Sequence, residues 1–172
     1  MNYEVIDNFL DNEDFLRIKN KIMDNNFFAW FFMKNVAIEN ITENNNAFYF
    51  VHTFFENWPN DPPKGELSPY FKDLNPLIDK MNIKDLWRIK ANMYPNQNKF
   101  IEHQSHADYD TPHQAAIFYI NNNNGFTRLE DGTKIESVEN RMLFFEGQRL
   151  HNSTNCTDEQ VRVNINFNYL RS

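Results

Sequence analysis

The stretch VRVNINFNYL, residues 161–170, alternates strictly between apolar and polar side chains. Alternation with a period of two residues predicts a β-strand whose two faces differ in polarity. One face carries Val161, Val163, Ile165, Phe167 and Tyr169, and the other carries Arg162, Asn164, Asn166 and Asn168. The polar row must face either solvent or a polar cavity inside a barrel, and the pattern alone allows both.

Further strands are predicted on the N-terminal side of this stretch. Residues 86–94 alternate in the same way, and the apolar runs at 114–120 and 141–147 are typical of buried strands. The pair Asp131-Gly132 predicts a hairpin turn between two more strands. The later half of the chain is therefore expected to be a series of antiparallel strands.

The first half of the chain mixes helices with aromatic-rich segments. Residues 11–23 predict a helix capped by the first of them, and residues 68–81 predict a helical segment that breaks or restarts just before Pro76. The aromatic runs at 27–33 and 47–55 predict buried strands. Helices followed by antiparallel strands predict an α+β fold whose later half is a β-sandwich or barrel.

Length predicts a single domain. The chain of 172 residues can bury one core. We expect supporting helices and strands over residues 1–85, and core strands that carry the candidate site over 86–172. The proline-rich segment 56–70 is predicted to be a loop, and the sequence leaves open whether it closes over a site.

Charge and cysteine usage narrow the class of partner. The formal net charge is −7 and no run of Lys and Arg appears, which argues against nucleic acid as a partner. Cys156 is the only cysteine, which suits a reducing compartment. The first residues lack the pattern of a signal peptide, and no apolar run is long enough to span a bilayer. We expect a soluble cytoplasmic protein with no membrane partner, in the host cytoplasm if a virus encodes it.

The segment FIEHQSHADYD, residues 100–110, concentrates side chains that bind metal ions. In extended backbone, residues i and i+2 point to the same side, so His106 and Asp108 would be presented together. They would supply two of the three ligands of a 2-His-1-carboxylate site, which leaves positions open on Fe(II). An isolated H-x-D match fits a polar loop equally well.

Two residues further along the chain strengthen the metal hypothesis. His151 follows the apolar run at 141–147 and a turn, where it can reach the same metal ion. Arg162 follows His151 by eleven residues, on the polar face of the next strand. A guanidinium there can form a two-pronged pair with the carboxylate of a bound ligand.

This order of H-x-D, His and Arg resembles the pattern of the Fe(II)- and 2-oxoglutarate-dependent oxygenases. The resemblance spans Arg88 to Leu170, and RMLFFEGQRLHNS and RVNINFNYL are especially similar to the closing strands of that family. The segment IDNFLDNEDFLRIKNKI resembles the helical support of the prolyl-4-hydroxylase-like branch. The resemblance implies a double-stranded β-helix, a distorted jelly roll, with iron inside its open end.

The resemblance also implies a set of site residues. His106, Asp108 and His151 would be the catalytic iron ligands, and Arg162 would bind the far carboxylate of 2-oxoglutarate. The implied cofactors are Fe(II) and 2-oxoglutarate, with O2 as cosubstrate.

Three residues nearby resemble cosubstrate contacts of particular branches. Asn92-Met93-Tyr94 is similar to an N-x-Y element of the DNA-alkylation-repair dioxygenases, where both polar side chains contact the cosubstrate. Asn164 stands where some members place a serine beside the arginine. Many prolyl-hydroxylase-like members have paired glycines before a threonine, of which only Gly125-Phe126-Thr127 remains here.

The implied activity is hydroxylation of a peptidyl substrate of the prolyl type, or of an amino acid, with release of succinate and CO2. The expected partner is a peptide, a protein or a small molecule. Oxidation of a nucleobase or nucleotide is an alternative, although the repair enzymes carry a second arginine where this chain has Asn168. A non-catalytic jelly-roll binding protein and a zinc site on the same ligands are further alternatives.

Other ligand-type residues are expected to play lesser parts. His103 should point to the face opposite His106, and Asp110 shares the parity of Asp108 but ranks below it as a ligand. A structural or exposed position is expected for His52 and His113, and no nucleophilic role for Cys156.

Overall fold

The computed structural model describes residues 2–36 and 47–171. The strands of these residues are β1 (Tyr3–Ile6), β2 (Phe31–Met33), β3 (Tyr49–Glu56), β4 (Gly65–Glu66), β5 (Ile83–Pro95), β6 (Gln114–Tyr119), β7 (Phe126–Leu129), β8 (Lys134–Glu136), β9 (Arg141–Glu146), β10 (His151–Ser153) and β11 (Val161–Arg171). The helices are α1 (Asn12–Met23), the 3-10 helix η1 (Phe71–Leu74) and α2 (Asn75–Lys80).

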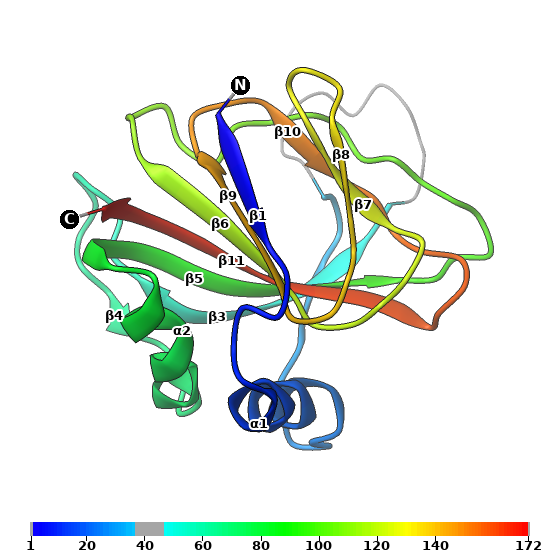
Figure 1. Ribbon diagram of the computed structural model, residues 1–172, viewed down its shortest axis with the longest axis horizontal. Coiled ribbons are helices and arrows are strands. Elements are labelled where there is room, and N and C mark those ends of the chain that lie inside the picture. Colours follow the sequence, from blue (N-terminus) through cyan, green and yellow to red (C-terminus); the bar gives the residue numbers. More distant parts are fainter. Residues whose placement is uncertain (1, 37–46, 172) are drawn as a thin grey trace.

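In the described part of the chain, the strands form two antiparallel sheets. The larger sheet has the order β1-β9-β6-β11-β5-β3-β2, with β4 paired to β3, and the smaller has the order β10-β7-β8. The helices lie on one side of the larger sheet, and the smaller sheet lies on the other (Figure 1). Two facing sheets with helical support are the predicted α+β jelly roll, and the fold prediction is confirmed.

Strand β11 lies at the centre of the larger sheet, between β5 and β6. The apolar residues on one of its faces belong to the same core as Phe15 and Ile18 of α1. The other face is also buried, although it is polar. The residues of this polar face are 0 to 7 % exposed, and they are Arg162, Asn164, Asn166 and Asn168. The sequence left open whether this row faces solvent or a cavity, and it faces the interior of the jelly roll.

Both helices begin where the sequence predicts. The Asp11 side chain caps α1 by accepting a hydrogen bond from the Asp14 backbone N–H at 3.0 Å. Phe15 packs edge-on against Phe118 of β6, which fixes α1 to the outer face of the sheet. The second helical segment restarts at Asn75 as α2, with Pro76 in its first turn, where a missing N–H costs no helical bond.

The prediction of a buried strand over residues 27–33 is wrong. Only Phe31–Met33 form a strand, β2, and it is an edge strand paired on one side to β3. Phe31 and Phe32 are each 60 % exposed and Phe27 is 88 % exposed. In this run Phe28 is buried, against His52 and Tyr70. Aromatic composition alone does not tell an edge strand from a central one.

No helix among the described residues is both long enough and apolar enough to cross a bilayer.

We predict that Asp11→Ala lowers the free energy of unfolding by about 1 kcal/mol, because α1 loses its N-terminal cap. Urea unfolding followed by circular dichroism measures the change. Asp24→Ala is the matched control, since Asp24 ends the helix with its backbone N–H and not with its side chain. Equal loss of stability in both variants would contradict the assigned cap.

Candidate metal centre

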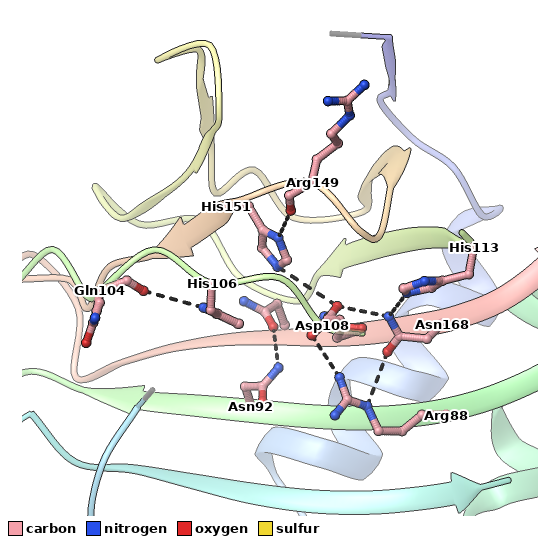
Figure 2. A network of polar contacts seen from close by, with 11 residues as sticks. Arg88, Asn92, Gln104, His106, Asp108, His113, Arg149, His151 and Asn168 are labelled. Carbon is pink, nitrogen blue, oxygen red and sulfur yellow. Dashed lines mark hydrogen bonds and ion pairs between the residues drawn. The ribbon is translucent and has the colours of Figure 1, made fainter. Parts of the chain in front are cut away.

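Three side chains converge at the open side of the jelly roll. The ligand-type atoms of His106, Asp108 and His151 all lie within 4.8 Å of one another. The His151 Nε2 atom is 3.9 Å from Asp108 Oδ2, and the two imidazole centroids are 4.8 Å apart. Figure 2 shows these side chains pointing toward one another. The group has the size and the donor types of a three-ligand metal site.

Backbone pairing explains why residues 45 positions apart meet. His106 and His151 form an isolated antiparallel bridge, in which each backbone N–H donates to the carbonyl of the other at 2.9 Å. The Asp108 N–H donates to the Gly147 carbonyl at 3.3 Å. Backbone hydrogen bonds therefore join the segment that carries H-x-D to Gly147 and to His151 at the start of β10. This pairing brings His151 to the candidate metal site.

Both imidazoles are oriented with Nε2 toward the site. His151 Nδ1 lies 3.0 Å from the Arg149 carbonyl, and His106 Nδ1 lies 3.4 Å from the Gln104 carbonyl (Figure 2). A carbonyl only accepts hydrogen bonds, so in each ring Nδ1 carries a hydrogen, and the neutral form of the ring would have its lone pair on Nε2. A carbonyl that fixes the imidazole in this way is the usual support of a metal-bound histidine.

Burial favours neutral imidazole at His106. Burial is the main cause that lowers its pKa from the ordinary value of 6.5, and the neighbouring His151 lowers it further. A neutral ring is the form that binds a metal ion.

Asp108 is a buried carboxylate with three donors. Its side chain is 6 % exposed. Arg88 Nη2 donates to Oδ1 at 2.9 Å, while Asn166 Nδ2 and Asn168 Nδ2 donate to Oδ2 at 3.1 and 2.9 Å. Burial alone would raise the pKa of Asp108, but the Arg88 charge, followed by His151 and the Asn168 hydrogen bond, lowers it well below the ordinary value. The group is ionised and keeps an acceptor position free for a metal ion.

Arg88 is a positioning residue that the sequence did not identify. It pairs in register with Asn168, and its Nε donates to Asn168 Oδ1 at 3.2 Å. Its guanidinium lies 4.7 Å from the centre of the Trp58 ring, which in turn stacks on Tyr109 at 4.8 Å. The register of two strands that lie far apart in the chain cannot be read from the sequence of either strand.

The proline-rich loop is fixed to the metal-binding segment. Tyr109, next to Asp108, donates its hydroxyl hydrogen to the Pro59 carbonyl at 2.9 Å. Trp58 stacks on the same tyrosine. The 56–70 loop therefore packs beside the candidate site.

Arg162 is completely buried, at 0 % exposure. It donates to Ser137 Oγ at 2.7 Å, to the Thr154 carbonyl at 3.1 Å and to Thr127 Oγ1 at 3.1 Å. No described carboxylate pairs with it. A buried guanidinium with neutral partners alone is costly, and a bound anion would stabilise it.

One cavity connects the metal-binding residues with the region of Arg162. Thr127, which accepts from Arg162, lines it. It is also lined by the predicted site residues His106, Asp108, His151, Asn92, Tyr94 and Asn164. Asn92 Nδ2 donates to Asn164 Oδ1 at 3.0 Å, and the Arg162 guanidinium lies 5.4 Å from the centre of the Tyr94 ring. Six of the seven predicted residues therefore line one cavity, and the seventh, Arg162, contacts the lining residues Thr127 and Tyr94.

Comparison with known proteins identifies the architecture. No family model and no curated protein matches the chain. Among solved structures, a 2OG-Fe(II) oxygenase family oxidoreductase from Burkholderia pseudomallei matches 99 % of this chain and 85 % of its own, with a TM-score of 0.70 and 9 % identity. A prolyl-4-hydroxylase from Pseudomonas putida matches 99 % and 93 %, with a TM-score of 0.60 and 14 % identity. A prolyl hydroxylase from Trichoplax adhaerens, in complex with a hypoxia-inducible-factor peptide fragment, matches 98 % and 83 %, with a TM-score of 0.60 and 16 % identity.

The fold is that of the 2OG-Fe(II) oxygenases. The predicted double-stranded β-helix is therefore confirmed, and so is the resemblance on which it rested, at the level of the fold.

Within this 2OG-Fe(II) oxygenase fold, the rival ligand residues lie apart from the metal-binding group. Asp110 is exposed. His103 is buried and stacks on Tyr94, with its Nδ1 atom 2.9 Å from Ser153 Oγ. His113 is buried and accepts from Asn168 Nδ2 at 3.1 Å, so it supports the Asp108 network.

Cys156 is also buried, and burial raises the pKa of its thiol. The sequence predicts no nucleophilic role for this residue and gives no sign of its burial.

Asp108→Ala should lower the affinity for Co(II) more than about a hundredfold, because it removes a ligand from a set of three. Isothermal titration calorimetry measures the affinity. Asp110→Ala is the matched control and should bind Co(II) as the wild type does. If the two variants behave alike, Asp108 is not a ligand.

Metal affinity should depend on pH in a defined direction. Because the pKa of His106 is lowered from 6.5, protons compete for its Nε2 atom mainly in the acidic range. We predict that Co(II) binding weakens progressively as the pH falls below 6.5. Calorimetric titrations across this range test the prediction, and affinity that improves on acidification would contradict it.

Proposed function

We propose that this protein is an Fe(II)- and 2-oxoglutarate-dependent dioxygenase that hydroxylates a peptidyl, prolyl-type substrate or an amino acid. One observation carries the proposal. A single cavity is lined by two imidazoles and a carboxylate of the candidate cation site, and by Thr127, which accepts from the buried Arg162. No carboxylate among the described residues pairs with this arginine. An anionic ligand that also coordinates the metal ion would satisfy both groups.

The three donors suit Fe(II). Two neutral imidazole nitrogens and one ionised carboxylate oxygen would hold the ion, and three protein ligands leave positions open for small ligands. When bound, Fe(II) with 2-oxoglutarate and O2 supplies the oxidising chemistry, with succinate and CO2 as coproducts. The other residues of the cavity would bind and orient the reactants and shield them from water.

Arg162 is proposed to bind the far carboxylate of 2-oxoglutarate. Three of its five N–H groups donate to fixed neutral oxygens, which holds the guanidinium in place and leaves donors for the ligand. Its burial excludes water, so a charge-assisted pair there is strong. Thr127 accepts from both Arg162 and the Tyr119 hydroxyl, which orders this end of the cavity.

Asn92 is proposed to contact the cosubstrate along the cavity wall. Its Oδ1 atom is buried and has no hydrogen-bond partner among the described residues, while its Nδ2 donates to Asn164. A buried amide oxygen without a donor is unusual, and a ligand or an ordered water would satisfy it. Tyr94 and Asn164 line the same wall and complete the proposed cosubstrate site.

Arg88 and Asn168 are proposed to orient the metal-binding carboxylate. They hold Asp108 through both oxygens, so it does not need to rearrange when a metal ion binds. We also propose that the protein acts in the cytoplasm as one oxygenase domain. The choice of a prolyl-type substrate is supported by the likeness to two prolyl hydroxylases, one of them bound to a peptide.

The test combines 2-oxoglutarate binding with turnover. Anaerobic protein loaded with Fe(II) should bind 2-oxoglutarate with a metal-to-ligand charge-transfer band, and O2 should then yield succinate. Arg162→Met should weaken 2-oxoglutarate binding by about tenfold to a hundredfold, as expected for a lost charge-assisted bond. Arg128→Met changes a partly exposed arginine beside Thr127 and is the matched control, which should bind 2-oxoglutarate normally.

Circular dichroism separates loss of binding from loss of folding. If Arg162→Met unfolds, Thr127→Val removes one acceptor of the guanidinium in a smaller step and should weaken the same binding. Absence of 2-oxoglutarate binding by the wild-type protein, or unchanged affinity in a folded Arg162→Met, would refute the proposal.

A further inference from the structure

The cavity carries a second cation that the proposed cosubstrate does not use. Lys90 lies on β5 between Arg88 and Asn92 and lines the cavity beside His106 and Asp108. Its ammonium is 5.8 Å from the centre of the Tyr49 ring. Among the described residues, no carboxylate lies within ion-pair distance of it.

The two described carboxylates that act on Lys90 are already engaged. Asp108 is held by Arg88 and two asparagines. Glu56 pairs with Lys64. Burial, and then the Arg88 charge, lower the pKa of Lys90 to about 7. These surroundings disfavour the ammonium, and an anion beside it would stabilise the charged form.

The charge of Lys90 is not offset by the described lining of the cavity. Among the lining residues that the structure describes, Lys90 is the one basic side chain of the Lys and Arg type and Asp108 is the one carboxylate. Asp108 already pairs with Arg88. A keto acid that binds the metal ion and Arg162 would therefore leave Lys90 without an anion.

Lys90 and Arg162 serve different parts of the cavity. In the register of β5 with β11, Lys90 lies opposite Asn166 and Tyr94 lies opposite Arg162. The two cations are thus four residues apart along the sheet, roughly 13 Å at the rise of a strand. A cosubstrate engaged by the metal ion and Arg162 leaves the Lys90 side free.

An unpaired acceptor lies next to Lys90. Asn166 is 7 % exposed, and its buried Oδ1 atom has no hydrogen-bond partner in residues 2–36 and 47–171. Its orientation is fixed, because Nδ2 donates to the Asp108 carboxylate, which only accepts. Asn166 and Lys90 are direct cross-strand neighbours, so a free donor and a free acceptor lie side by side.

We propose that Lys90 binds a carboxylate of the primary substrate, while Asn166 Oδ1 accepts a hydrogen bond from an N–H or O–H group of the same molecule. The primary substrate is then a carboxylic acid of the amino-acid type, free or as part of a peptide. This inference rests on the proposed function and names the substrate class of that site.

The test uses a carboxylate probe and its neutral counterpart. Protein loaded with diamagnetic Zn(II) and saturated with 2-oxoglutarate is titrated at pH 6.5 with trifluoroacetate or trifluoroacetamide, and binding is followed by the width of the fluorine NMR signal. Wild-type protein should broaden the trifluoroacetate signal and leave the trifluoroacetamide signal sharp. In Lys90→Met the broadening should fall at least fivefold. Lys84→Met, an exposed lysine at the start of the same strand, should behave as the wild type does.

Each other outcome overturns the inference. Broadening that is absent in the wild type, or equal in Lys90→Met, excludes a carboxylate site at Lys90. Broadening that 2-oxoglutarate abolishes, or weaker 2-oxoglutarate binding by Lys90→Met, assigns Lys90 to the cosubstrate instead. Calorimetric titration of the Zn(II) protein with 2-oxoglutarate tests the proposed function separately. If 2-oxoglutarate does not bind, that function fails, and the comparison of wild type with Lys90→Met in Zn(II) protein alone still decides the role of Lys90.

Discussion

The inner face of β11 buries a guanidinium and three carboxamides, and this constraint shapes the whole site. Polar groups removed from water destabilise a fold unless they find partners. At one end of the row, Asn166 and Asn168 donate to the Asp108 carboxylate, and so does Arg88. At the other end, the described partners of Arg162 are neutral oxygens. One strand therefore creates a place for a cation and, further along, a place for an anion.

The scaffold keeps these two places rigid. The opposite face of β11 packs into the main core together with α1, so the strand cannot tilt without disrupting that core. The histidines lie outside the central strands, but the bridge between His106 and His151 ties them to each other. Imidazole orientation then follows from local carbonyls of the same two segments. A loop-borne site becomes as well positioned as one built on strands.

The sequence reveals what depends on local pattern and hides what depends on register. Alternation identified β5 and β11, and the i, i+2 spacing brought His106 and Asp108 to one side. Neither pattern shows that Arg88 lies opposite Asn168, or that Lys90 lies opposite Asn166. Those pairs arise from strand pairing over some 80 residues of chain. The prediction of a buried strand over residues 27–33 failed for a related reason. Aromatic content predicts a strand but not its place at the sheet edge.

Anomalous diffraction at the iron edge, on crystals grown anaerobically with Fe(II) and 2-oxoglutarate, tests the central claim most directly. The account predicts one strong peak bonded to Nε2 of His106, Nε2 of His151 and a carboxylate oxygen of Asp108. It also predicts density for the keto acid that runs from the metal ion to the Arg162 guanidinium. An iron peak on other residues, or a keto acid that does not contact Arg162, would contradict it.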